Sequence, residues 1–204
     1  MDERAGVVRK SDLAHEPLEQ FRLWFADAEG AGIRAPHGMA LATSTADGAP
    51  SVRMVLLKGF DERGFAFFTG YVSRKSTELD ANPRAALLFF WDPLGRQVRI
   101  EGGVERVTEG ESDAYFATRP RGAQLAAAAS RQSEVLSGRD ELDARVAALE
   151  RERAGADVSR PDHWGGYRLV PGTYEFWQHR EDRLHDRLRY RRDDGGWVVE
   201  RLSP

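Results

Sequence analysis

Positively charged side chains occur in three short motifs whose composition suits anion binding. The first is residues 53–58 (RMVLLK), in which a cation stands at each end of an apolar run. In a regular strand Arg53 and Lys58 point to opposite faces, so both reach one site only if the strand bulges or ends there. The alternative is a buried strand whose charged ends extend along its surface into water.

The second motif, residues 69–75 (TGYVSRK), leads from the end of a strand into the start of a helix. Free backbone N–H groups, the hydroxyls of Thr69 and Ser73 and two adjacent cations together suit a phosphate. Arg74 and Lys75 oppose the helix dipole at this position, where acidic residues are preferred. A bound anion would relieve that conflict, which favours a binding site over a solvated helix start.

The third motif is residues 183–187 (RLHDR). If this segment is a strand, Arg183, His185 and Arg187 share one face. Three potential cations side by side repel one another unless an anion or a polar ligand lies over them. An exposed edge strand kept soluble by its charge is the competing interpretation.

Weaker signals lie at expected helix breaks and in one strand. Residues 115–121 and 130–133 place polar and cationic groups where backbone donors are free. Trp177 in a strand is more typical of a core than of a ring-stacking surface. The sequence has no dinucleotide-binding glycine motif, P-loop or HExxH motif, and its five His show no tight ligand spacing, so no metal site is predicted.

Composition excludes several classes of protein. The 204 residues include no Cys, which excludes disulfides, a thiol nucleophile and Cys-ligated metals. With 30 basic and 33 acidic residues the net charge is −3, which argues against a nucleic-acid-binding protein. No signal peptide or membrane-length apolar run is present, so a cytoplasmic protein is expected. Only Lys10, Lys58 and Lys75 are Lys, and two of them fall in the phosphate-suited motifs.

Hydrophobic periodicity predicts one domain that is mainly β with peripheral helices. After an N-terminal arm (1–16) and a helix (17–30), barrel strands are expected over 39–107, at 39–45, 51–60, 65–69, 84–91 and 97–107. A helical insertion at 73–82, with Ser73 as its N-cap, interrupts them. A helical segment (109–154) follows, broken at 120–122, and its last part (138–154) packs Leu142, Val146 and Leu149 on the core. The C-terminal region (167–204) adds strands at 172–178, 184–191 and 197–202 that complete an antiparallel barrel without exposed edges.

Nine motifs, in order and spacing, resemble the pyridoxamine 5′-phosphate oxidase family. They are residues 53–58, 67–69, 73–75, 96–98, 119–121, 132–133, 164–166, 175–178 and 183–187. The resemblance extends from about residue 12 to the end of the chain. It implies a split β-barrel homodimer with FMN at the subunit interface. The implied reaction oxidises pyridoxamine 5′-phosphate or pyridoxine 5′-phosphate to pyridoxal 5′-phosphate with O₂, releasing hydrogen peroxide.

The resemblance also assigns roles to residues by position. The residues it implies for FMN binding are Arg53, Met54, Val55, Leu56, Leu57, Lys58, Phe68, Thr69, Arg74, Lys75, Gln97, Gln132, Ser133, Trp177 and Arg187. Lys58, Tyr115 and Arg119 would hold the substrate phosphate. Arg183 and His185 would lie over the substrate ring as the catalytic pair, while the flavin performs the redox chemistry.

Departures from the family pattern keep other functions open. Ala123 replaces a Ser common at the substrate phosphate, residues 126–128 are Ala in place of Gly-Ala-Trp, Phe68 replaces a frequent Tyr, and the N-terminal arm is short. One alternative is a related FMN-dependent oxidase of another substrate, such as a phenazine precursor. Another is a non-catalytic barrel that binds FMN or pyridoxal phosphate.

Overall fold

The computed structural model describes residues 7–204, so residues 1–6 of the expected N-terminal arm lie outside the described residues. The strands are β1 (Gly38–Ser44), β2 (Pro50–Leu56), β3 (Gly59–Asp61), β4 (Gly64–Gly70), β5 (Arg84–Trp91), β6 (Arg96–Arg106), β7 (Trp164–Gln178), β8 (Asp186–Asp193) and β9 (Gly196–Arg201). The helices are α1 (Pro17–Gly30), α2 (Arg74–Ala81), α3 (Glu109–Ala117), α4 (Arg121–Ala129) and α5 (Arg139–Glu152), with short 3₁₀ turns η1 (Lys10–Asp12), η2 (Asp92–Leu94) and η3 (Glu181–Arg183).

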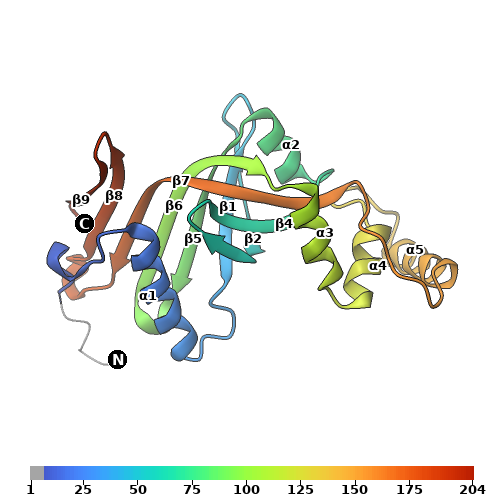
Figure 1. The fold of residues 1–204 in the computed structure, drawn as a ribbon, viewed down its shortest axis with the longest axis horizontal. Coiled ribbons are helices and arrows are strands. Elements are labelled where there is room, and N and C mark those ends of the chain that lie inside the picture. Colours follow the sequence, from blue (N-terminus) through green and yellow to red (C-terminus); the bar gives the residue numbers. More distant parts are fainter. Residues whose placement is uncertain (1–6) are drawn as a thin grey trace.

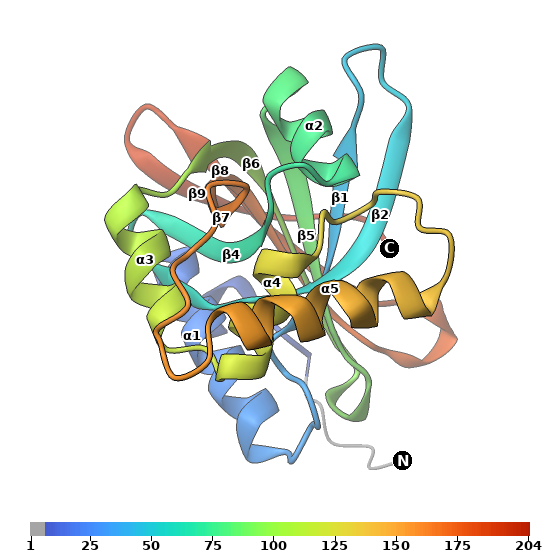
Figure 2. The same cartoon turned by 90° about the vertical axis from the view of Figure 1, so that its right-hand side faces the viewer.

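All these strands belong to one antiparallel sheet. Its order is β2-β1-β5-β6-β7-β4-β3, and β8 and β9 extend it from β7. Figures 1 and 2 show α3, α4 and α5 at one end of the molecule and the β8–β9 hairpin at the other. The predicted class, a mainly β antiparallel split barrel with peripheral helices, is confirmed. No helix within residues 7–204 is long and apolar enough to cross a membrane.

The long strand β7 supports both ends of the sheet. It pairs with β6 through residues 167–178, with β4 through residues 164–169 and with β8 through residues 173–178. The register between β6 and β7 shifts at Glu101/Gly102, where Gly172 of β7 is skipped, and this lets β7 bend where it changes its second partner. The strands β8 and β9 therefore extend the sheet only from the C-terminal part of β7, residues 173–178.

The barrel is split between β2 and β4. The two strands form no ladder, but the Lys58 N–H, just beyond β2, donates to the Ala66 carbonyl in β4 at 2.9 Å. The Leu57 N–H turns the other way and donates to the His37 carbonyl at 2.8 Å. These diverging bonds break the strand expected over 51–60 into β2 and β3 and hold the two sides of the gap in place.

A cluster of aromatic rings fills the interior of the barrel. Phe21 of α1 is fully buried, and its ring lies 4.9–5.0 Å from the rings of Phe60, Phe65 and Phe89. Edge-to-face pairs of this kind add stability beyond the burial of their area. The expected helix over residues 17–30 is thus the element that closes this core.

A second apolar cluster lies under the helical segment. It contains Phe116, Leu125, Val158 and Trp164, all buried. The expectation that α5 packs on the main core is wrong, because none of its residues is buried and its Val146 and Leu149 pack on this second cluster instead. Leu142 lines an open cavity.

Two further boundaries differ from the sequence-based expectation. The helical segment breaks at residues 118–120, and Pro120 takes the N-cap position of α4, where an imino nitrogen costs no hydrogen bond. The strand expected over 184–191 begins at Asp186, because Asp182 and Arg183 adopt left-handed φ values of 54° and 59° in η3. Arg183 and His185 therefore lie on a turn before β8, and the expected strand face shared with Arg187 is wrong.

A substitution at Gly102 tests the close approach of β6 and β7 at the point where their register shifts. A Cβ there would lie 1.9 Å from the Val170 carbonyl oxygen, whereas a Cβ at Gly103 would meet only the Pro83 carbonyl at 3.9 Å. We expect Gly102→Ala to lower the free energy of unfolding by about 2 kcal/mol or more through overpacking. The measurement is thermal unfolding, and Gly103→Ala is the matched control. Equal effects of the two substitutions would contradict this account.

Candidate active site

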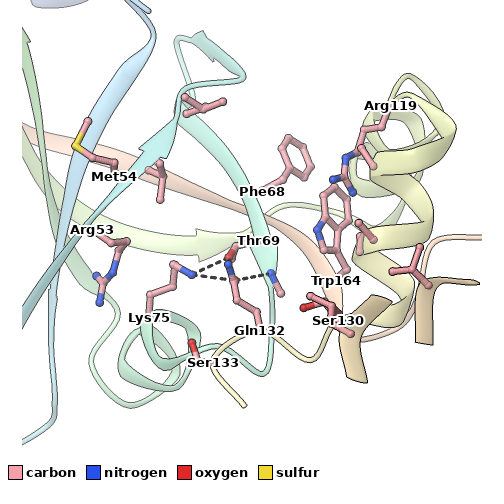
Figure 3. Close-up of a pocket in the computed structure, with 18 of the residues that line it drawn as sticks. Arg53, Met54, Phe68, Thr69, Lys75, Arg119, Ser130, Gln132, Ser133 and Trp164 are labelled. Carbon is pink, nitrogen blue, oxygen red and sulfur yellow. Dashed lines mark hydrogen bonds between the residues drawn. The ribbon is translucent and has the colours of Figure 1, made fainter. Parts of the chain in front are cut away.

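A cavity of about 1410 Å³ opens where the barrel is split, between β2, β4, the start of α2 and the helical segment (Figure 3). It brings together most of the predicted site residues: Arg53, Met54, Val55, Leu56, Lys58, Phe68, Thr69, Arg74, Lys75, Tyr115, Arg119, Gln132 and Ser133. Arg53 and Lys58 reach the same cavity because β2 ends at Leu56.

Lys75 is the buried cation of this cavity, with only 6% of its surface exposed. Its Nζ donates to Thr69 Oγ1 at 3.0 Å and to Gln132 Oε1 at 3.0 Å (Figure 3). It also donates to Ser73 Oγ at 3.2 Å. No carboxylate within residues 7–204 lies in ion-pair distance of it. Burial, and next the charge of Arg53, lower the pKa of Lys75 to about 8, although Glu78 opposes the shift. An ammonium without a counter-ion in this setting favours an anionic ligand.

Glu78 anchors two arginines of the cavity, Arg53 and Arg74. This α2 residue is 3% exposed. Its Oε1 accepts from Arg74 Nε at 2.8 Å, and its Oε2 accepts from Arg53 Nη2 at 3.3 Å and from the hydroxyls of Thr43 and Ser51. Burial alone would raise the pKa of this carboxyl, but the hydrogen bonds outweigh it and lower the pKa to about 2. The carboxylate is thus fixed in its charged form.

The structure confirms Ser73 as the N-cap residue of α2, although no side-chain hydrogen bond closes the cap. Its hydroxyl lies instead 3.1 Å from the Ser76 hydroxyl and accepts from Lys75. The first helical N–H, that of Arg74, donates weakly to Ser133 Oγ at 3.3 Å. The expected N-cap hydrogen bond is therefore absent, and this hydroxyl serves the Lys75 cluster.

Gln132 gathers the donors of this cluster on one atom. Its Oε1 accepts from Thr69 Oγ1 at 2.7 Å and from the Gly70 N–H at 3.3 Å, in addition to Lys75. Three donors converging on one oxygen form an arrangement that a phosphate oxygen could also satisfy. The residue after it, Ser133, has a left-handed φ of 75°.

Aromatic rings separate this cluster from a second cationic position. Phe68 stacks on Tyr115 with ring centroids 4.1 Å apart and on Trp164 at 5.6 Å. The backbone of β7 lies directly against the Phe68 ring at Gly166, where an added Cβ would be 2.7 Å from the ring. This wall gives the cavity one flat apolar side.

Arg119 is the second cationic position. Its guanidinium lies over the Trp164 ring at 4.7 Å (Figure 3), and its Nη1 is buried without a hydrogen-bond partner among residues 7–204. Burial lowers the pKa of Arg119, while the neighbouring Tyr115 opposes the shift. Lys58 lies near the same wall, with its Nζ 5.9 Å from the Tyr115 ring centre. An orphaned buried donor of this kind calls for an acceptor, and a phosphate or carboxylate supplies one.

Six predicted site residues do not line this cavity. Leu57 is buried in the main core. The others, at the β8 end of the sheet, are Gln97, Trp177, Arg183, His185 and Arg187. Figure 1 shows β8 on the opposite side of the molecule from α4 and α5. The chain therefore separates its predicted site residues into a cavity group and a β8-end group.

Three members of the β8-end group, Gln97, Trp177 and Arg187, lie in one row across the sheet. Phe90 of β5 pairs with Gln97 of β6, which pairs with Trp177 of β7, which pairs with Arg187 of β8. Residues paired directly across strands share a face. Trp177 is half-buried on this face, so the expectation of a core Trp is wrong. Arg187 is held by Glu175, whose Oε1 accepts from Arg187 Nε at 2.7 Å.

His185 lies beside Trp177 with ring centres 4.5 Å apart. Its Nδ1 accepts from the Arg180 N–H at 3.1 Å, so a neutral ring carries its proton on Nε2. Burial, followed by the charges of His179 and Arg183, lowers the pKa of His185. The ring is thus neutral at neutral pH, with a free N–H donor. Arg183 itself is exposed on η3.

An apolar surface joins the two groups on the same sheet. On β2, Val52 and Met54 are 68% and 70% exposed, and Leu88 and Phe90 of β5 are also exposed. Met54 and Leu88 both pair with Ala40 of β1, so they form one continuous face. An exposed apolar face of this extent indicates a protein interface.

Sequence reasoning missed three polar residues of the site: Thr43, Ser51 and Glu78. Glu78 stands four residues after Arg74, an i,i+4 spacing that was available as a signal. No sequence signal pointed to Thr43, because its contact with Glu78 depends on the packing of β1 on α2. Among the described residues, no three His, Cys, Asp or Glu side chains are grouped to hold a metal ion.

Family models match most of the chain. Residues 25–151 match the model described as pyridoxamine 5′-phosphate oxidase. Residues 164–204 match the pyridoxine 5′-phosphate oxidase C-terminal dimerisation region. The chain belongs to the pyridoxamine 5′-phosphate oxidase family. This confirms the predicted family, the enzyme class of FMN-dependent oxidoreductase and the cofactor FMN. The dimerisation region supports the predicted homodimer.

Curated relatives cover nearly the whole chain. The pyridoxine/pyridoxamine 5′-phosphate oxidase of Rubrobacter xylanophilus is 60% identical over 201 residues, which cover 98% of this chain and 92% of the relative. The protein of the same name from Bordetella pertussis is 56% identical, covering 98% of this chain and 94% of its own length.

Among solved structures, PhzG from Burkholderia lata in complex with tetrahydrophenazine-1-carboxylic acid is 36% identical, with a TM-score of 0.92 and full coverage of both chains. A pyridoxamine 5′-phosphate oxidase-related, FMN-binding protein from Nostoc punctiforme shares the fold at a TM-score of 0.73 and 16% identity, covering 94% of this chain and all of its own.

The buried ammonium of Lys75 predicts a pH-dependent stability. Its pKa is about 8 in the folded chain against 10.5 when exposed, so the folded state loses this proton first. The free energy of unfolding of the FMN-free protein should rise between pH 8 and 10, by up to about 3 kcal/mol. Lys75→Met should lack this increment, as measured by urea unfolding at each pH. An identical pH profile in wild type and variant would contradict the prediction.

Proposed function

We propose that this enzyme oxidises pyridoxamine 5′-phosphate and pyridoxine 5′-phosphate to pyridoxal 5′-phosphate, with O₂ as acceptor and hydrogen peroxide as product. The observation that carries the proposal is the pair of cationic positions in one cavity, at Lys75 and Arg119, neither with a carboxylate partner among residues 7–204. A cofactor and a substrate that each bear a phosphate would satisfy both. The aromatic wall between them suits flat rings.

The contacts of each position suggest which ligand it takes. We place the FMN phosphate at the Lys75 cluster, with Thr69, Arg74 and Arg53, and Gln132 and Ser133 beside it. The substrate phosphate would lie at Arg119, with Lys58 and Tyr115. Ala123 also lines the cavity, so the hydroxyl that the family often supplies there is missing. Arg119 would therefore carry a larger share of phosphate binding.

The β8-end group completes the site if it comes from a second subunit. Gln97, Trp177 and Arg187 share a row with exposed Phe90, and the apolar surface extends from there to Met54 at the cavity. Burying this surface in a homodimer would bring the β8 end of one chain to the cavity of its partner. We therefore propose that each active site contains residues of both subunits.

The Lys75 cluster would hold FMN by its phosphate, and the bound flavin would supply the redox chemistry that couples oxidation at substrate C4′ to O₂. Oxidation of the alcohol yields aldehyde and hydrogen peroxide, and oxidation of the amine also consumes water and releases ammonia. The chain orients the substrate. Arg119 fixes the phosphate, and Arg183 and His185 approach the ring, where the neutral His185 offers its Nε2 proton to a ring oxygen.

A second candidate substrate is a reduced phenazine carboxylic acid. The close structural similarity to PhzG and the Ala at position 123 favour it. The carboxylate of such a substrate could also pair with Arg119. The higher identity to oxidases named for pyridoxine and pyridoxamine 5′-phosphate favours the first candidate.

Anaerobic flavin reduction separates these candidates. Purified holoenzyme is mixed without O₂ with pyridoxamine 5′-phosphate, pyridoxine 5′-phosphate or tetrahydrophenazine-1-carboxylic acid, and the flavin absorbance is followed. We expect rapid bleaching with the first two, and pyridoxal 5′-phosphate and peroxide when O₂ is admitted. Bleaching by the phenazine alone would favour the second candidate. Bound FMN that none of the three reduces would support a non-catalytic barrel.

Mixed dimers test the shared site. Lys75→Met disables the cavity group, and Arg183→Ala disables the β8-end group of the same chain. A dimer of one chain of each kind has one site with both defects and one intact site. Coexpression with two affinity tags should therefore restore about half of wild-type turnover to the isolated mixed dimer. Each variant alone should be nearly inactive. Mixed dimers no more active than the parent variants would show that one chain builds each site.

A further inference from the structure

Glu78 is a buried charged residue to which the proposed reaction assigns no role. It is an anion placed among the cations that should bind a phosphate, with 3% of its surface exposed. A negative charge at this position weakens the attraction for a phosphate, so its presence needs a reason. A buried carboxylate is also costly unless its acceptors are satisfied.

The geometry supplies the reason. Each carboxylate oxygen holds a different arginine: Oε1 accepts from Arg74 Nε at 2.8 Å, and Oε2 accepts from Arg53 Nη2 at 3.3 Å. Arg53 comes from β2 and Arg74 from the start of α2, so Glu78 joins two elements that are separate in the sequence. Thr43 and Ser51 donate to Oε2 and fix the carboxylate itself.

Without this anchor the arginines would lose their positions. Arg74 is exposed, and Glu78 holds its side chain. Arg53, Arg74 and Lys75 would also repel one another with no carboxylate among them, which would favour conformations that point into solvent. The charge of Glu78 also acts on Lys75. Burial and the charge of Arg53 lower the pKa of Lys75, and Glu78 opposes this lowering.

We propose that Glu78 is a positioning residue for the cofactor phosphate, holding Arg53 and Arg74 at the distance that lets both act with Lys75. This rests on the proposed placement of the FMN phosphate at the Lys75 cluster. Two effects of the carboxylate oppose each other. If anchoring dominates, removing the charge weakens phosphate binding; if simple charge balance dominates, removing it strengthens binding.

Glu78→Gln separates the two effects. The amide keeps the shape of the side chain, but its NH₂ group cannot accept from a guanidinium. The measurement is the affinity of the FMN-free dimer for FMN and for riboflavin, which lacks the phosphate, by quenching of flavin fluorescence. We expect roughly tenfold weaker FMN binding, the loss of about one charge-assisted contact, with riboflavin binding unchanged. Normal riboflavin binding also reports that the variant is folded.

Glu111→Gln is the matched control. Glu111 also has a pKa lowered to about 2, and it also holds two arginines, since its Oε1 accepts from Arg168 Nη2 at 2.8 Å and from Arg63 Nη1 at 2.9 Å. It does not line the cavity. We expect its substitution to leave the FMN-to-riboflavin affinity ratio unchanged.

Thr43→Val is a milder second variant in case Glu78→Gln does not fold. It removes the hydroxyl that donates to Glu78 and accepts from Arg53, while keeping the size of the side chain. It should lower the FMN-to-riboflavin ratio by a smaller factor. An unchanged ratio in a folded Thr43→Val protein would overturn the proposal if Glu78→Gln cannot be tested.

The outcomes distinguish this proposal from the one on which it rests. A wild-type protein that binds riboflavin as tightly as FMN would show that the phosphate site itself is wrong, and the role of Glu78 would fall with it. If the wild type prefers FMN and Glu78→Gln retains or increases that preference, the proposed phosphate site is supported. Only the anchoring role of Glu78 is then overturned. Equal losses for FMN and riboflavin would show that Glu78 supports the fold alone.

Discussion

The pairing of β7 with three other strands is the constraint on which the rest of the structure depends. Its first residues pair with β4, its last residues pair with β8, and β6 pairs with it from residue 167 to its end. Both groups of site residues are attached to this strand or to its partners: Thr69 through β4 at one end, and Trp177 and Arg187 at the other. A 15-residue strand is rigid and long, so a single chain cannot fold the two groups together. The separation is built into the sheet, and it makes the dimer a requirement of the proposed site.

The second organising feature is the balance of charge inside the cavity. The whole chain carries a net charge of −3, yet the cavity concentrates cations. The structure tolerates this by burying the carboxylate of Glu78 beside Arg53 and Arg74. Outside the cavity, at the β8 end, the buried carboxylate of Glu175 holds Arg187 in the same way. Lys75 and Arg119 are left without such partners among the described residues, and these two positions are the ones suited to ligands.

Much of the site could be predicted from sequence because its signals are local. The RMVLLK and TGYVSRK motifs carry their cations within a few residues, and a helix start after a strand end implies free N–H groups wherever it occurs. Two of the three Lys in an Arg-rich chain do line the cavity. The errors arose where the outcome depends on contacts distant in sequence. The helix α5 packs on a second cluster instead of the main core, and a left-handed turn places Arg183 before β8. Ser73 occupies the predicted N-cap position of α2, but its hydroxyl accepts from Lys75 instead of closing the cap.

The sequence by itself determined the class of fold, the family and the residue types suited to phosphate, because periodicity and short motifs are properties of neighbouring residues. The tertiary structure alone decided which of those residues meet. Thr43, Ser51 and Glu78 lie on three different elements and form one network only when β1, β2 and α2 pack together. Gln97, Trp177 and Arg187 align only through the register of three strands, and the same register carries them away from the cavity. Hydrogen-bond register and side-chain packing act between segments far apart in the chain, and for that reason a linear pattern could not specify them.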